Sequence, residues 1–180
     1  MRFIVSVFTL AMLIFLGTLA CNASAQERAH AVLKNSDGKT VGTARLRETK
    51  QGVLVSLQIS ALSAGLHAVH IHGTGKCEAP AFTSAGGHFN PLNMKHGLKS
   101  SDGPHAGDLP DLYVNKDGTG RYEALMESVS LSAGKISVFD ADGSAIVVHA
   151  LPDDNTTDPA GNSGDRIACG VIERGSAKSR

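Results

Sequence analysis

Apolar residues recur at every second position in one stretch of the chain, at Val53, Val55, Leu57 and Ile59. Polar residues fill most of the positions between them, and this period of two predicts a half-buried β-strand. Shorter β-favouring runs occur at residues 31–33, 40–47, 66–72, 113–114, 121–126, 135–139, 145–149 and 167–172. No long period of 3.6 competes with them, so the pattern predicts an all-β protein.

Turn-forming segments rich in Asn, Asp and Gly separate several of these runs, at residues 35–38, 115–118 and 140–143. Short strands joined by such turns indicate a β-sandwich or a β-barrel. Two longer segments, 73–110 and 152–166, are rich in Gly, Pro, Asn, Asp and Ser. Loops of this length in a compact domain are usually functional or disordered, and we expect functional loops here.

The N-terminus has the pattern of a secretory signal peptide. Met1 and Arg2 precede an apolar run over residues 3–20, and Ala23-Ser24-Ala25 forms a small-x-small cleavage site. We therefore expect residues 1–25 to be removed and residues 26–180 to form one exported domain, with no membrane span after removal. A retained membrane anchor and a lipoprotein acylated at Cys21 are the alternatives.

Removal of the signal peptide leaves two cysteines, Cys77 and Cys169. In an oxidising compartment an even pair predicts a disulfide, whose 92-position loop would stabilise the fold by about 4–5 kcal/mol in the chain-entropy treatment. The mature part carries 16 basic and 17 acidic residues, since only Arg2 among the 17 basic residues lies in the signal peptide. No basic block or aromatic run indicates a nucleic-acid partner.

Histidine is concentrated in the middle of the chain. His70 and His72 end a predicted strand, where the period of two places both imidazoles on one face. His88, His96, His105 and Asp108 follow within one Gly-rich loop, and three imidazoles with one carboxylate suit tetrahedral zinc. His149 on a later strand completes a nitrogen-rich set that suits copper. These seven side chains predict a paired transition-metal site.

Five motifs carry a resemblance to a known family: HAVHIH (67–72), GGHFNP (86–91), HGLKSSDGPHAGD (96–108), VVHALPDD (147–154) and GDRIACGVI (164–172). In them the chain resembles the secreted copper/zinc superoxide dismutases, over nearly the whole mature part. The resemblance implies an eight-stranded Greek-key β-barrel, an immunoglobulin-like sandwich, with two long functional loops. It also implies an enzyme that dismutates superoxide to dioxygen and hydrogen peroxide with one copper and one zinc per chain.

The resemblance further implies a role for each candidate residue. Copper would bind His70, His72, His88 and His149, and zinc would bind His88, His96, His105 and Asp108. His88 would bridge the metals and act in catalysis, and Arg166 would guide the superoxide anion. Asp153 would link His70 to His96, while His67 would form hydrogen bonds across the site without binding a metal. His30 matches no role, and we expect it at the surface.

The chain departs from the family pattern at Ala68-Val69, Ala150-Leu151 and Ala160. In that family, charged residues that help to attract superoxide often stand where this chain has Ala150-Leu151. The sequence therefore does not predict the catalytic rate. A copper-binding or storage domain on the same fold, without catalysis, is the alternative function. We expect export to a periplasm or to the cell exterior, and a homodimer. Asn155-Thr156-Thr157 is a glycosylation sequon that matters only in a host that glycosylates.

Overall fold

The computed structural model describes residues 27–175, so the predicted signal peptide and Cys21 lie outside the described residues. The described part contains ten strands and one short 3-10 helix, with these bounds: β1 Arg28–Lys34, β2 Thr40–Thr49, β3 Gly52–Ile59, β4 Gly65–His67, β5 Val69–His72, η1 Thr83–Ala85, β6 Leu112–Val114, β7 Gly120–Met126, β8 Ala145–His149, β9 Arg166–Val171 and β10 Glu173–Arg174. Within residues 27–175 no helix has the length and apolar character needed to cross a bilayer.

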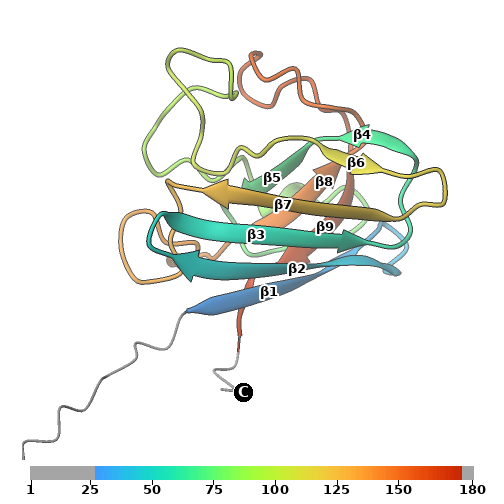
Figure 1. Ribbon diagram of the computed structural model, residues 1–180, viewed down its shortest axis with the longest axis horizontal. Helices are drawn as coiled ribbons and strands as arrows, with labels where there is room; N and C mark the ends of the chain where they lie inside the picture. The colour runs from blue at the N-terminus through green and yellow to red at the C-terminus, as the bar shows by residue number, and fades with distance from the viewer. Residues whose placement is uncertain (1–26, 176–180) are drawn as a thin grey trace, which may run out of the picture.

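Eight of these strands form one antiparallel sheet in the order β5-β8-β9-β1-β2-β3-β7, with β10 added on β1, and β4 pairs with β6 in a small second sheet. The main sheet curls on itself (Figure 1), and its inward-facing side chains form the larger of two buried hydrophobic clusters of the described residues. The late strand β9 returns to lie beside the first strand β1, which is a Greek-key type of connection. The predicted all-β Greek-key fold is therefore confirmed.

The alternating strands supply the core. On β3 the predicted inward positions Val53, Val55, Leu57 and Ile59 are all buried, and β1 contributes Ala29, Ala31 and Leu33 in the same way. Full burial of one such large aliphatic side chain contributes roughly 1.5–3 kcal/mol. Because a slip of one residue would turn this whole apolar set to solvent, the alternation also fixes the register of the strands.

Two predicted strands differ from the structure. The run 66–72 is divided at Ala68 into β4 and β5, whose hydrogen-bond partners lie in different sheets. The strand predicted at 135–139 is wrong, since this segment is a turn with one isolated bridge from Ser137 to Ser130. The amide of Val138 donates to the carbonyl of Ser130, so the segment folds back on itself. Val138 is nevertheless buried, which explains the apolar pattern.

The long loops lie beside one another at one end of the sheet, where Figure 1 draws them in yellow-green and orange. Main-chain contacts join them, including a hydrogen bond of 3.1 Å from the Lys99 amide to the Asn155 carbonyl. The predicted disulfide between Cys77 and Cys169 is confirmed, with a Cα–Cα distance of 5.6 Å. It ties the first loop to β9. A third long connection, residues 127–144, replaces the strand expected there.

Candidate metal centre

Strands β5 and β8 carry three of the predicted ligands. They pair antiparallel, with His70 opposite Val147 and His72 opposite Ala145, and His149 ends β8. Val69 and Ile71 face the core, so the two intervening histidines face outward, beneath the loops. Loop coverage still leaves His70, His72 and His149 with at most 3% of their surface exposed. The strand period thus places these imidazoles together on one covered face.

The first long loop is fastened along β5 by its main chain. The Ile71 amide donates to the Gly107 carbonyl, and the Phe89 amide donates to the Ile71 carbonyl, at 2.9 and 2.8 Å. These contacts bring His88 next to β5, where its ring centroid lies 3.9 Å from that of His70. They also bring Asp108 opposite His70 through an isolated bridge.

Four imidazole nitrogens in this cluster are buried and lack any hydrogen-bond partner in the described residues: His70 Nδ1, His72 Nε2, His88 Nε2 and His149 Nε2. They lie within 4.8 Å of one another. In three of these rings the other nitrogen faces an oxygen that accepts a hydrogen bond. The His70 nitrogen lies 2.7 Å from the Asp153 carboxylate, that of His72 lies 2.9 Å from the Gly86 carbonyl, and that of His149 lies 3.2 Å from the Gly164 carbonyl. A neutral imidazole that donates there keeps its lone pair on the unpartnered nitrogen. The cluster therefore presents convergent lone pairs, as a metal requires.

A second set lies on the other side of His88. The carboxylate oxygen Asp108 Oδ1 lies 2.9 Å from His88 Nδ1, 3.2 Å from His96 Nδ1 and 3.4 Å from His105 Nδ1. Tetrahedral zinc with bonds of about 2.0–2.1 Å separates its donor atoms by roughly 3.3 Å. The spacing of these atoms therefore fits a tetrahedral metal, and His88 belongs to both sets.

Asp153 connects the two sets from behind. Its carboxylate accepts hydrogen bonds from His70 Nε2 at 2.7 Å and from His96 Nε2 at 3.0 Å. Burial opposes ionisation of this carboxyl, but the hydrogen bonds from His70 and His96 outweigh it and lower the pKa of Asp153 to about 2. Asp153 therefore stays an anion and fixes the tautomer of both rings, which increases their basicity as ligands.

Burial makes several imidazoles of the cluster poor bases. Desolvation lowers the pKa of His70 to about 4 and that of His149 to about 3, with repulsion from neighbouring histidines adding to the effect. Desolvation also lowers the pKa of His105. Neutral imidazole is the form that binds metals, so these rings are ready to bind at neutral pH.

Arg166 opens β9 opposite His149. Its Nη1 donates to the Phe82 carbonyl and its Nη2 to the Gly86 carbonyl, both at 2.7 Å. The Gly86 carbonyl also accepts from His72 Nδ1. A guanidinium held by two main-chain oxygens is a fixed positive charge next to the unpartnered nitrogens.

The remaining predicted residues belong to neither donor set. His67 is buried, and its nitrogens face the main-chain carbonyls of His149 and Ser63 at 2.8 and 2.9 Å. His30 is exposed on β1, 3.6 Å from Glu173. The main-chain N–H of Asn155 donates a hydrogen bond to Asp153 Oδ1 at 2.7 Å.

The sequence interpretation missed three residues that shape the site. Ser163 Oγ lies 3.2 Å from His149 Nδ1, and Asp158 accepts a hydrogen bond from the His96 amide. Gly161 lies against the Asp153 carboxylate with φ of 62°. All three fall in a segment rich in turn-forming residues, where their composition shows nothing beyond a loop.

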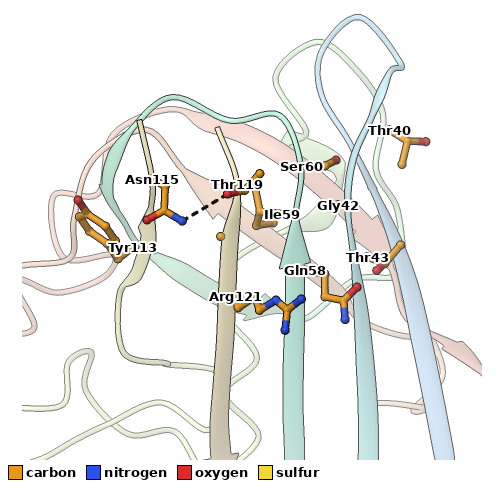
Figure 2. A pocket seen from close by; sticks show the side chains of 11 residues that line it. Thr40, Gly42, Thr43, Gln58, Ile59, Ser60, Tyr113, Asn115, Thr119 and Arg121 are labelled. Carbon is orange, nitrogen blue, oxygen red and sulfur yellow. Dashed lines mark hydrogen bonds between the residues drawn. The ribbon is translucent and has the colours of Figure 1, made fainter. Parts of the chain in front are cut away.

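A pocket of about 730 Å³ lies away from these residues, along β2, β3 and the turn before β7. Figure 2 shows its polar lining, with Gln58 and Arg121 on adjacent strands and a hydrogen bond from Asn115 to Thr119. It contains none of the predicted metal ligands. The predicted metal ligands therefore lie in the covered histidine cluster and not in this hollow.

Comparisons with known proteins agree on one family. The family described as copper/zinc superoxide dismutase (SODC) matches residues 40–172. A protein named superoxide dismutase [Cu-Zn] 2 from Aquifex aeolicus is 47% identical over 86% of this chain and 91% of its own length. The superoxide dismutase [Cu-Zn] of Caulobacter vibrioides is 44% identical over 81% of this chain and 85% of its own length.

A solved structure shares the fold as well. The crystal structure of a SOD-like protein from Bacillus subtilis is 40% identical and aligns with a TM-score of 0.75. The alignment covers 79% of this chain and 96% of that chain. Sequence and architecture thus lead to the same group of proteins.

Proposed function

The chain belongs to the copper/zinc superoxide dismutase family, and from this membership and its histidine cluster we propose that it catalyses the dismutation of superoxide. Two superoxide anions and two protons yield one dioxygen and one hydrogen peroxide. The single observation that carries the proposal is the convergence of four buried imidazole nitrogens, all without a hydrogen-bond partner in the described residues. A structural β-sandwich without metal would have no reason to maintain four such nitrogens together.

The donor chemistry supports the assignment of the two metals. We propose that copper binds His70, His72, His88 and His149, because a set made only of imidazoles suits copper. Zinc would bind His88, His96, His105 and Asp108, since three imidazoles and a carboxylate form a common tetrahedral zinc site. The family cofactors are one copper and one zinc per chain. Bound copper supplies one-electron redox chemistry, whereas zinc, which has a single oxidation state, supplies charge and order.

His88 is the proposed proton carrier. Its Nδ1 lies with the zinc donors, 2.9 Å from Asp108, while its Nε2 faces the copper donors without a partner in the described residues. Whenever Nε2 is not bound to a metal, it can hold one proton and deliver it to reduced superoxide. Water supplies the second proton that hydrogen peroxide requires.

Arg166 is the proposed anion guide. Two of its donors are fixed by the carbonyls of Phe82 and Gly86, and the guanidinium has further N–H groups for a small anion. Burial lowers the pKa of Arg166, but a guanidinium starts so high that it stays charged at neutral pH. A fixed cation at this position attracts superoxide and orients it near the copper donors.

One experiment tests the proposal against a copper-storage domain. Copper and zinc content are measured together with superoxide consumption, in the wild type and in His149→Ala. We expect one copper and one zinc per chain and catalytic turnover, with copper and turnover lost in the variant while zinc remains. The surface substitution His30→Ala is the control and should change neither. A copper-loaded wild type without turnover would favour storage, and a fully active His149→Ala would refute the ligand assignment.

The export of the protein remains a proposal that rests on residues 1–25. Their apolar run and cleavage site support removal of a signal peptide and a destination in a periplasm or outside the cell. The disulfide agrees with an oxidising compartment. N-terminal sequencing of the exported protein should give Gln26 as the first residue, whereas an acylated Cys21 would show the lipoprotein alternative.

A homodimer is also proposed. Leu66 and Tyr113 are opposite one another on β4 and β6, and half or more of each residue is exposed. Such a pair could be covered by a second copy of the chain. Sedimentation equilibrium measures the mass directly, and a monomer at micromolar concentration would contradict the dimer.

A further inference from the structure

Asp158 reaches from the second long loop to the zinc donors of the first. Its Oδ1 accepts a hydrogen bond of 2.9 Å from the main-chain amide of His96. Its Oδ2 accepts one of 3.1 Å from Lys95 Nζ. The same Oδ1 lies 3.9 Å from Nε2 of His105. One carboxylate therefore faces the main chain of one proposed zinc ligand and the outer ring nitrogen of another.

We propose that Asp158 is a positioning residue for zinc, which fixes the main chain at His96 and places negative charge behind His105. The inference rests on the proposed assignment of zinc to His88, His96, His105 and Asp108. It adds a residue that does not itself bind the metal.

His96 is held at three points, each by a carboxylate. Asp153 accepts from its ring at Nε2, 3.0 Å away, and Asp108 Oδ2 accepts from the following amide, Gly97 N, at 2.8 Å. Asp158 holds the amide of His96 itself. Without Asp158 the main chain of this fully buried histidine would lose one of its anchors, and its Nδ1 would be placed less accurately toward the metal.

Asp158 places negative charge behind His105, as Asp153 does behind His96, but at a longer distance. A carboxylate behind the outer N–H of a ligand imidazole raises the basicity of the inner nitrogen. At 3.9 Å the His105 contact is longer than a hydrogen bond, so its present effect is electrostatic. Asp153 serves His70 and His96, whereas among the described residues Asp158 is the second-loop carboxylate that faces His105.

The exposed contact with Lys95 indicates that the effect of Asp158 should be measured on zinc binding and not on folding stability. The side chains of Lys95 and Asp158 are 63% and 41% exposed, and ion pairs so exposed add little to folding stability. A simple surface link between loops would therefore change little when it is removed. A positioning role predicts instead a loss that is specific to zinc.

The test compares Asp158→Asn and Asp158→Ala with the wild type. Asp102→Asn is the matched control, because Asp102 lies on the loop of His96 and its carboxylate makes no hydrogen bond among the described residues. The zinc dissociation constant of copper-free protein is measured by chelator competition. Cobalt bound in place of zinc is followed by its visible absorption, which reports tetrahedral geometry. The copper dissociation constant and the unfolding midpoint are measured on the same proteins.

We expect Asp158→Ala to weaken zinc binding by about 10- to 100-fold, as substitutions behind metal ligands do, and to alter the cobalt spectrum. Asp158→Asn should fall between Ala and the wild type, because its amide oxygen still accepts from His96 N–H while the charge is gone. Copper binding should stay near that of the wild type, while the unfolding midpoint should fall only slightly, because Asp158→Ala leaves the buried His96 amide without its acceptor. Asp102→Asn should leave zinc binding unchanged.

Two results would overturn the inference while the proposed function stands. One is zinc binding by Asp158→Ala that equals that of a zinc-binding wild type. The other is an equal loss of copper and zinc affinity with a much lower unfolding midpoint, which would show a general anchor for the loop. A wild type that binds no zinc at these residues would overturn the zinc assignment, and the inference with it.

Discussion

Gly161 gives the sharpest prediction because a single methyl group would disturb both metal sets. The residue has φ of 62°, in the left-handed region, and a Cβ built on it overlaps Asp153 Oδ1 and lies 2.7 Å from His96 Nε2. In Gly161→Ala the Asp153 carboxylate must therefore leave its position between His70 and His96. Both of its histidine contacts, at 2.7 and 3.0 Å, would be lost or lengthened.

The expected cost has two parts. Left-handed backbone strain in a residue with a Cβ costs about 1 kcal/mol. Each hydrogen bond to the ionised Asp153 contributes about 1.5 kcal/mol, and two of them are affected. We therefore expect Gly161→Ala to lower the free energy of unfolding of the metal-free protein by about 4 kcal/mol and to weaken binding of both metals by roughly 10- to 100-fold.

Urea unfolding of the metal-free protein measures this loss, and chelator competition measures the metal affinities. Gly38→Ala is the matched control, because Gly38 has φ of 77° and nothing lies within 4 Å of its added Cβ. The control carries the backbone strain alone, about 1 kcal/mol, with unchanged metal binding. If Gly161→Ala loses no more stability than Gly38→Ala, the proposed displacement of Asp153 is refuted.

Three further predictions concern the disulfide, acidity and the arginine. Replacing Cys77 and Cys169 together by Ser should lower the free energy of unfolding by about 4 kcal/mol; urea unfolding measures it, and an unchanged midpoint would contradict the constraint. The folded-state pKa values of His70 and His149, about 4 and about 3, lie below the unfolded value of 6.5. Stability of the metal-free protein is therefore fully present above pH 6.5 and is lost as the pH falls toward 4, by up to roughly 3 kcal/mol per pH unit for the two histidines together. Unfolding curves that coincide at pH 6 and pH 4.5 would contradict this. Arg166→Ala should reduce superoxide turnover roughly tenfold or more without changing metal content, since it removes the charged contact to the anion, worth about 1.5–3 kcal/mol. Arg166→Lys should recover only part of it, because an ammonium lacks the planar fork that holds the Phe82 and Gly86 carbonyls and still leaves N–H groups for the anion. Turnover after pulse radiolysis is the measurement, and full activity of Arg166→Ala would exclude an anion-guiding role.

The fold could be predicted where side-chain pattern and backbone role coincide. On β3 the period of two at Val53 to Ile59 is also the period of burial, so the prediction needed no tertiary information. At residues 135–139 the apolar pattern and the backbone structure do not coincide. Val138 is apolar because it packs into the core, yet Gly134 with φ of 151° and the return bond to Ser130 make the segment a turn. An apolar alternation reports burial, and hydrogen-bond partners distant in the sequence decide whether a strand forms.

The site likewise has a part that local spacing predicts and a part that depends on contacts between distant segments. Spacing alone places His70 and His72 on one face, because residues two positions apart on a strand point to the same side of the sheet. The contribution of the second loop depends on contacts between segments more than 50 residues apart, such as Asp158 with the His96 amide, which is 62 positions away. Nothing local distinguishes Asp158 or Gly161 from ordinary turn residues. Their roles become visible only when the loop is placed against the histidines.

A single carbonyl contacts both the proposed anion guide and a proposed copper ligand. Gly86 O accepts from His72 Nδ1 at 2.9 Å and from Arg166 Nη2 at 2.7 Å, so it fixes the tautomer of a proposed ligand and the place of the guiding charge together. The loop that carries it is tied to β9 by the Cys77–Cys169 disulfide, and Cys169 lies three residues after Arg166 on that strand. A displacement of this loop must therefore move the charge and the ligand together. Because they share one acceptor, substitutions near Gly86 should change substrate attraction and copper binding jointly, even where they touch neither group.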